Sequence, residues 1–294
     1  MQKKIKFLPL YAILLLLILL GVFFTNKHKE SSSQIDKNIS HGTLSVIDDF
    51  YSPELDNSKT LRIYLPYGYE ASDKQYPVIY MQDGQNLFDD NTASYYVEWG
   101  IDETLDELYT DSKTNGVIVV GIDSNSETRV DEYNPFKGVS DGQTTPQGGK
   151  ADKYAKFIVN TLKPYIDKNY KTLPDRSNTA IVGSSYGAVI SLYTAIEYKD
   201  KFAMVGAFSF ADNLNAIEMR KYLANNLIPE KLKDTKIYFY VGTNDFALDS
   251  TKNAYNIAKK NGLTDILYEE DNGEHHERSW RPMFKNCVEF FELN

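Results

Sequence analysis

The feature that most constrains this chain is a turn between two apolar segments, within residues 178–188. Residues 179–182 form a short β-branched apolar run, which is typical of a buried strand, and apolar residues at helical spacing follow in 188–196. The turn has the pattern G-x-S-x-G, centred on Ser185. The pattern alone is also typical of an ordinary glycine-rich turn. Between a strand and a helix, however, it predicts a nucleophile elbow, in which a strained turn exposes the hydroxyl of Ser185.

Composition and charge exclude several kinds of partner and site. The chain has 294 residues and a net charge of −9, which argues against nucleic acid as a partner. Its only cysteine, Cys287, cannot form an intramolecular disulfide and does not suggest a cysteine-based zinc site. Cys287 lies in an amphipathic stretch and is expected to be a buried core thiol. We expect no cofactor and no metal.

The first 41 residues differ in composition from the rest. An apolar run in residues 7–24, after a basic start, is about as long as the ~20 residues that span a bilayer. We therefore expect residues 1–30 to be an uncleaved signal anchor that places the following domain outside the cell, with a cleaved signal peptide as the alternative. Residues 31–41 are polar and predict a tether. Residues 42–294 then form one folded domain.

Strands and helices alternate along this domain, which predicts an α/β fold with a mostly parallel, eight-stranded sheet and helices on both faces. The segment 124–150 interrupts the alternation and is expected to overhang a site at the carboxyl ends of the strands. The expected strands are 43–51, 60–66, 76–81, 116–122, 178–182, 202–208, 236–241 and 265–269, and the expected helices are 99–109, 151–170, 188–196, 214–226, 251–261 and 277–293.

A serine nucleophile needs a base, and the base needs an acid to orient it. His275 and His276 follow the last expected strand, and either could be the base. The two together could also bind a metal, but no third ligand stands at a suitable spacing. The acid should lie between the serine and the base in sequence. Asp245 follows the seventh expected strand directly and is the natural choice, with Asp249 as the rival.

The negative charge that develops on the substrate needs two backbone donors. One is the amide after the nucleophile, that of Tyr186. The other should come from the loop after the third expected strand, where Gly84 lets the backbone turn inward. We predict that the N–H groups of Gln85 and Tyr186 form an oxyanion hole.

Several motifs together resemble the family of α/β hydrolases named Putative esterase, which includes esterase D-like, feruloyl, acetyl-xylan and siderophore esterases. The resemblance runs from about residue 60 to 291. It is carried by Tyr80-Met81-Gln82-Asp83-Gly84-Gln85-Asn86-Leu87-Phe88-Asp89, Arg129 with Glu132-Tyr133-Asn134-Pro135, Gly148-Gly149-Lys150-Ala151-Asp152, Gly183-Ser184-Ser185-Tyr186-Gly187, and Gly273-Glu274-His275-His276-Glu277 with Trp280.

The family pattern G-x-H-x-E-x-x-W falls on residues 273–280 and implies that His275, not His276, is the base. It likewise implies Ser185 as the nucleophile and Asp245 as the acid. Tyr186 and Ala188 depart from relatives, which often carry methionine and glycine there. The resemblance implies an α/β-hydrolase fold.

The resemblance implies a serine carboxylic ester hydrolase that works through an acyl-enzyme, on small-molecule or glycan esters. The expected signal anchor would place this reaction outside the cell. Sugar, phenolic and siderophore esters are all candidate substrates. An acyltransferase on the same triad and a catalytically inactive envelope-binding protein are the alternatives. Arg129 and Glu132 could orient a polar substrate, or they could pair with each other as a structural lock.

Overall fold

The computed structural model describes residues 41–139 and 144–293. The predicted signal anchor and nearly all of the predicted tether lie outside the described residues. Among the helices that are described, none combines the length and the apolar character needed to cross a membrane.

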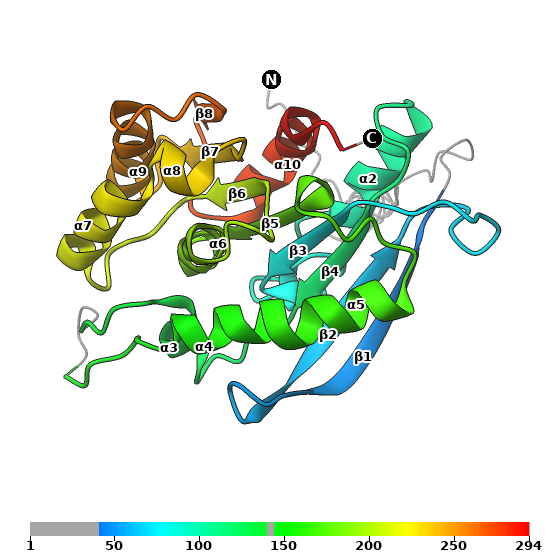
Figure 1. Ribbon diagram of the computed structural model, residues 1–294, viewed down its shortest axis with the longest axis horizontal. Helices are drawn as coiled ribbons and strands as arrows, with labels where there is room; N and C mark the ends of the chain where they lie inside the picture. Colours follow the sequence, from blue (N-terminus) through cyan, green and yellow to red (C-terminus); the bar gives the residue numbers. More distant parts are fainter. Residues whose placement is uncertain (1–40, 140–143, 294) are drawn as a thin grey trace, which may run out of the picture. The chain divides into compact units, whose positions relative to one another are not determined.

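The core of the fold is one sheet of eight strands in the order β1-β2-β4-β3-β5-β6-β7-β8 (Figure 1). The pairs β1–β2 and β2–β4 are antiparallel, and every other pair is parallel. The predicted mostly parallel, eight-stranded sheet is therefore confirmed. The strands are β1 Thr43–Ser52, β2 Asn57–Leu65, β3 Val78–Gln82, β4 Ile118–Ile122, β5 Thr179–Ser184, β6 Met204–Phe208, β7 Lys236–Gly242 and β8 Ile266–Asp271.

Helices cover both faces of the sheet, as expected. One buried cluster packs α4, α6, α7 and α9 against the sheet, and a second packs α2 and α10. The helices are α2 Ile101–Thr110, α3 Arg129–Tyr133, α4 Ala151–Lys156, α5 Lys163–Asn169, α6 Tyr186–Glu197, α7 Ala216–Asn226, α8 Pro229–Leu232, α9 Leu248–Lys260 and α10 Glu277–Phe291, with 3-10 turns η1 Gly84–Asn86 and η3 Arg176–Asn178 and the π-helical segment η2 Phe157–Leu162.

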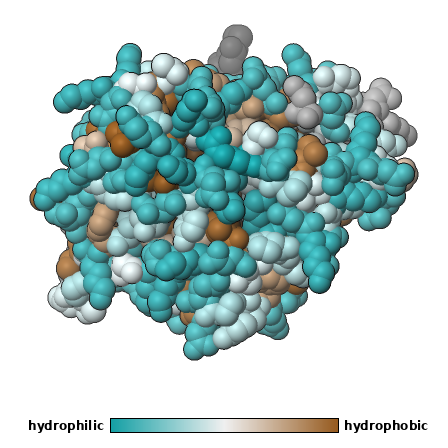
Figure 2. Space-filling model, in the orientation of Figure 1, coloured by the Kyte–Doolittle hydropathy of each residue, from teal (hydrophilic) through white to brown (hydrophobic). Residues whose placement is uncertain are grey.

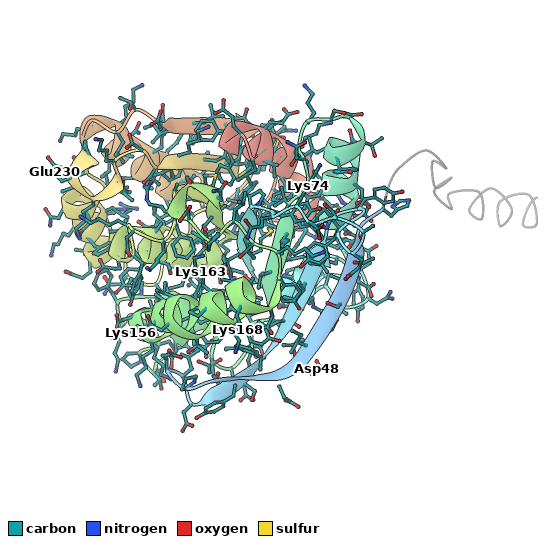
Figure 3. All side chains as sticks on the ribbon, turned by 45° about the vertical axis from the view of Figure 1, so that its right-hand side comes forward. Asp48, Lys74, Lys156, Lys163, Lys168 and Glu230 are labelled. Carbon is teal, nitrogen blue, oxygen red and sulfur yellow. The ribbon has the colours of Figure 1, made fainter. Side chains whose placement is uncertain are left out.

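The predicted helix at 151–170 is continuous in the structure but changes its winding. A π-helical segment, η2, joins α4 to α5 without a break. Lys156, Lys163 and Lys168 lie along this helix (Figure 3). Lys163 is buried, and its ammonium group is satisfied by Asp167 at 2.9 Å and by the carbonyl of Pro174.

The face of the molecule seen in Figure 2 is mostly hydrophilic, with hydrophobic residues scattered over it. The buried apolar side chains form the two clusters that pack the helices against the sheet.

Candidate active site

The turn between β5 and α6 has the strained geometry that the sequence predicts. Ser185 separates the strand from the helix with φ 58° and ψ −126°, a region that L-residues rarely adopt. Gly183 is required there, because a Cβ atom on it would lie 2.5 Å from the carbonyl oxygen of Gly187. The Ser185 amide donates to the carbonyl of Phe208 at 2.9 Å, which ties the turn to the end of β6.

An aspartate and a histidine meet at the carboxyl end of the sheet. Asp245 follows β7 and His275 follows β8, and the distance from Nδ1 of His275 to Oδ1 of Asp245 is 2.8 Å. Because a carboxylate only accepts hydrogen bonds, Nδ1 carries the hydrogen and Nε2 is left as the basic atom. The side chain of Asp245 is fully buried and also accepts from the amide of Ala247 at 2.7 Å.

The environment of Asp245 favours its charged form. Burial opposes the charge, but hydrogen bonds from His275, Ser209 and the Ala247 amide outweigh it and hold the pKa of Asp245 below its usual value. The rival acid, Asp249, lies in the first turn of α9 and makes no hydrogen bond to His275 among the described residues. The structure therefore pairs His275 with Asp245.

The second histidine of the pair has a different position. The backbone of His276 forms the N-cap of α10, and its Nδ1 accepts the amide hydrogen of Arg278 at 3.2 Å. Its ring lies against Tyr95, with the ring centres 5.7 Å apart. His276 is thus engaged at the start of α10, while its neighbour is paired with Asp245.

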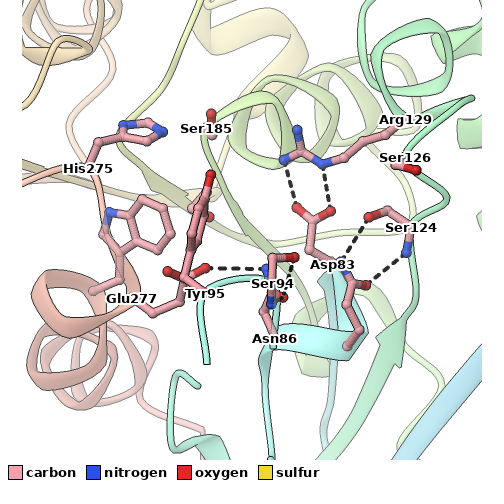
Figure 4. A pocket seen from close by; sticks show the side chains of 13 residues that line it. Asp83, Asn86, Ser94, Tyr95, Ser124, Ser126, Arg129, Ser185, His275 and Glu277 are labelled. Atoms are coloured by element: carbon pink, nitrogen blue, oxygen red, sulfur yellow. Dashed lines mark hydrogen bonds and ion pairs between the residues drawn. The ribbon is translucent and has the colours of Figure 1, made fainter. Parts of the chain in front are cut away.

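Ser185 and His275 line one pocket of about 390 Å³. Figure 4 shows the imidazole of His275 turned toward Ser185, with Tyr95 beside both. In the part of the chain that the structure describes, the Ser185 hydroxyl makes no hydrogen bond to His275. Catalytic hydrogen bonds are often long or absent in a site without substrate.

Two backbone amides near Ser185 have no acceptor within the described residues. One belongs to Gln85 in η1, and the other to Tyr186 at the first position of α6. The Gln85 side chain donates to the Ser124 hydroxyl and accepts from the Ser124 amide, both at 3.0 Å. This pairing joins η1 to the segment that follows β4, and Ser124, Ser126 and Arg129 of that segment line the pocket, as expected of an overhanging loop.

A family model described as Putative esterase matches residues 52–291. The chain belongs to the Putative esterase family. It is 29% identical over 215 residues to an endo-1,4-beta-xylanase/feruloyl esterase of Xylanibacter ruminicola, an alignment that covers 71% of this chain and 26% of that protein. The chain is also 24% identical over 172 residues to an acetyl esterase of Caldicellulosiruptor saccharolyticus, an alignment that covers 48% of this chain and 64% of that protein. Family membership and these relatives show that the chain is a carboxylic ester hydrolase.

Solved structures share the fold of this esterase. A ferulic acid esterase has a TM-score of 0.68 at 20% identity, covering 86% of this chain and 98% of its own. The enterobactin esterase of Shigella flexneri, solved in the presence of enterobactin, has a TM-score of 0.66 at 15% identity, covering 85% of this chain and 58% of its own. At these identities the similarity shows the α/β-hydrolase fold.

The alternative in which Arg129 pairs with Glu132 is wrong, because each of these two side chains has another partner. Arg129 donates from Nε and Nη2 to the two carboxylate oxygens of Asp83, at 2.7 and 2.8 Å. Its guanidinium also lies over the rings of Tyr133 and Tyr186. Asp83 has φ 55°, so Arg129 holds a strained residue two positions before Gln85.

Glu132 is directed into the protein, and it is not among the residues that line the pocket. It accepts from Lys59 at 2.6 Å and from Asn57 at 3.0 Å, both from β2. The side chains of Lys59 and Glu132 are 2% and 1% exposed, so this is a fully buried ion pair. The residue predicted to bind substrate therefore connects α3 to the sheet.

Replacing Glu132 with glutamine should lower the free energy of unfolding by about 3 kcal/mol, because the substitution leaves the buried Lys59 ammonium without its counter-charge. Urea denaturation measures this loss. The matched control is Asp152→Asn, which breaks an exposed pair with Lys156 and should change stability by less than about 0.5 kcal/mol. Equal effects of the two substitutions would show that burial of the Lys59–Glu132 ion pair adds nothing to the free energy of unfolding.

Two residues next to the site of the esterase were not predicted as site residues from the sequence. Asp83, 6% exposed, holds Arg129, and Ser209, fully buried, contacts Asp245. Both follow a parallel strand directly, and both have positive φ. Their place after a strand was visible in the sequence, but their partners come from distant segments.

Proposed function

We propose that the chain is a serine carboxylic ester hydrolase in which Ser185 is the nucleophile, His275 the general base and Asp245 the acid that orients it. The observation that supports this most is the partly buried 2.8 Å hydrogen bond between Asp245 and His275, with His275 and a strained serine lining the same pocket. Three segments far apart in sequence supply these groups. This is the arrangement that a serine needs to become nucleophilic near neutral pH.

The proposed reaction proceeds in two halves. Oγ of Ser185 attacks the carbonyl carbon while its proton passes to Nε2 of His275. The imidazolium then gives this proton to the departing alcohol, which leaves an acyl-enzyme on Ser185. Water attacks the acyl carbon and gives a proton to His275, the acid departs, and Ser185 recovers its proton. Asp245 remains charged throughout and stabilises the imidazolium.

The N–H groups of Gln85 and Tyr186 are proposed to stabilise the oxyanion. Gln85 lines the pocket and Tyr186 directly follows Ser185, which also lines it, and neither amide has another acceptor among the described residues. The amino end of α6 adds a favourable partial charge to the second amide. Donors of this kind are each worth about 100-fold or more in rate.

Aromatic acid esters are the proposed substrates. The exposed ring of Tyr95 lines the pocket, and the exposed ring of Phe246 lies 4.2 Å from the ring of His275, so aromatic surfaces flank the nucleophile. Two of the similar proteins are named for ferulic acid or its acyl group. We place the reaction outside the cell, because the apolar run in residues 7–24 follows a basic start.

The proposal is tested with methyl ferulate, p-nitrophenyl acetate and a catecholate siderophore ester, each incubated with the full chain. We expect hydrolysis of the first two and the highest kcat/KM for methyl ferulate. Rates that equal the uncatalysed background for all three esters would contradict the proposal. Product analysis with an added sugar acceptor separates hydrolysis from acyl transfer.

Replacing Arg129 with lysine should lower kcat by about 10-fold or more with little change in KM. A lysine cannot reproduce the two parallel bonds to Asp83, so the turn that carries the Gln85 amide loses its support. Steady-state kinetics measure both constants. Arg220→Lys alters an Arg–Asp pair outside the pocket and is the control. A higher KM with unchanged kcat would instead make Arg129 a substrate-binding residue.

A further inference from the structure

A buried serine contacts the acid of the proposed triad from the side opposite His275. Ser209 follows β6 directly, is 0% exposed and has φ 49°. Its amide donates to the carbonyl of Tyr240 at 2.7 Å, which holds the strained residue against β7. Its hydroxyl lies 2.6 Å from Oδ2 of Asp245.

A tryptophan determines the direction of this hydrogen bond. Nε1 of Trp280 lies 2.8 Å from Oγ of Ser209, and an indole nitrogen can only donate. The Ser209 oxygen therefore accepts from Trp280, and its single proton is directed to Asp245. The tryptophan ring also meets the imidazole of His275 edge to face, with ring centres 5.2 Å apart.

These contacts close a ring of four residues: Ser209, Asp245, His275 and Trp280. The two carboxylate oxygens of Asp245 have separate donors, because Oδ1 accepts from His275 and Ala247 and Oδ2 accepts from Ser209. Rotation of the carboxylate would break bonds on both oxygens at once. Trp280, 4% exposed, contacts both the serine that holds the acid and the imidazole that the acid orients.

We propose that Ser209 and Trp280 are positioning residues for ester hydrolysis, which hold the Asp245 carboxylate in the orientation that directs Nε2 of His275 at the nucleophile. This inference rests on the proposed triad. Neither residue touches the reacting atoms in this role. Trp280 acts through Ser209 and through its packing on His275, and Ser209 acts through Asp245.

The groups around Asp245 show why its charged form needs the Ser209 hydroxyl. Among the described residues, the titratable groups that face Asp245 are His275, from the turn before α10, and Tyr240 of β7, whose hydroxyl is bonded to Asp271 at 2.7 Å. Without the Ser209 hydroxyl, Oδ2 has no hydrogen-bond donor among the described residues. A lost donor to the charged form raises the pKa of a carboxyl group.

The test compares Ser209→Ala with Ser209→Gly in the full chain. Both remove the hydroxyl, but glycine adopts a positive φ without strain. We expect kcat to fall by about 10- to 100-fold in both, the usual effect of removing a hydrogen bond to a charged group, with KM changed by less than about 2-fold. The acid limb of kcat against pH should move to higher pH, because the Asp245 carboxylate, having lost a donor, attracts the proton on the imidazolium more strongly.

Trp280→Phe is the second variant, because it keeps an aromatic ring next to His275 and removes the indole donor. This variant should also lower kcat, as the Ser209 variants do. The control is Ser250→Ala, which removes another 2.6 Å serine–aspartate bond, to Asp212, outside the pocket. It should leave kcat and the pH profile unchanged.

Three outcomes separate this inference from the proposed function. A glycine variant with the kcat and acid limb of the wild type would overturn the role of Ser209, provided that Ser185→Ala is inactive. Recovery of activity in Ser209→Gly but not in Ser209→Ala would also overturn it, because backbone strain would then explain the alanine defect. An active Ser185→Ala variant would overturn the proposed triad and this inference together.

Discussion

Replacing Ser185 with alanine is expected to lower kcat for ester hydrolysis by about 10,000-fold or more. The proposed mechanism passes through an ester of the Ser185 oxygen, and no acyl-enzyme can form without it. The remaining rate should come from binding and from the free amides of Gln85 and Tyr186, which still polarise the carbonyl. Steady-state hydrolysis of methyl ferulate by the full chain measures this loss.

The neighbouring residue provides a matched control. Ser184 also lines the pocket, but it is the last residue of β5 and lies outside the strained turn at Ser185. Ser184→Ala should retain kcat within about 10-fold, because nothing in the mechanism passes through its hydroxyl. A Ser185→Ala variant as active as Ser184→Ala would contradict the assignment of the nucleophile.

Replacing Asp245 with asparagine is expected to lower kcat by about 10,000-fold. The amide keeps the size of the side chain, but it lacks the charge that stabilises the imidazolium. It also presents a possible N–H donor to Nδ1 of His275, which favours the tautomer with its hydrogen on Nε2. Stopped-flow or steady-state kinetics from pH 5 to 9 measure the effect.

The rival acid tests the specificity of that result. Asp249→Asn should leave kcat unchanged, because Asp249 lies in the first turn of α9 and makes no hydrogen bond to His275 within the described residues. A large loss in Asp249→Asn together with a small loss in Asp245→Asn would reverse the assignment. It would also mean that the observed hydrogen bond to His275 has no catalytic role.

The strands and the elbow were predictable because their signals are local. The β-branched run before Ser185 and the apolar spacing after it both act within a few residues, and the structure places β5 and α6 there. Local sequence signals could not distinguish His275 from His276, because the two residues are neighbours in sequence and differ only in the side chains that the fold places next to them. The resemblance to a family was needed to choose between them.

Long-range pairing was the part that sequence reasoning could not supply. Arg129 and Glu132 are three residues apart in α3, a spacing that permits an ion pair on a helix. In the structure Asp83 accepts two hydrogen bonds from Arg129, while Glu132 forms an ion pair with the buried Lys59. Each partner comes from a different strand or turn, so the sequence spacing in α3 could not reveal it.

The contact between Ser209 and Asp245 was invisible for the same reason. Ser209 is 36 residues away from Asp245 in sequence, and the two meet because β6 and β7 are neighbouring parallel strands. A serine directly after a parallel strand is a weak signal by itself. It becomes informative only when strand order shows that its neighbour carries the acid.

The most direct test of the central claim is covalent labelling with a fluorophosphonate probe, followed by peptide mass spectrometry of the full chain. The proposed mechanism predicts a single adduct on Ser185, which is absent in Ser185→Ala and forms much more slowly in His275→Ala. Equal labelling of wild type and Ser185→Ala, or an adduct confined to another serine, would contradict it.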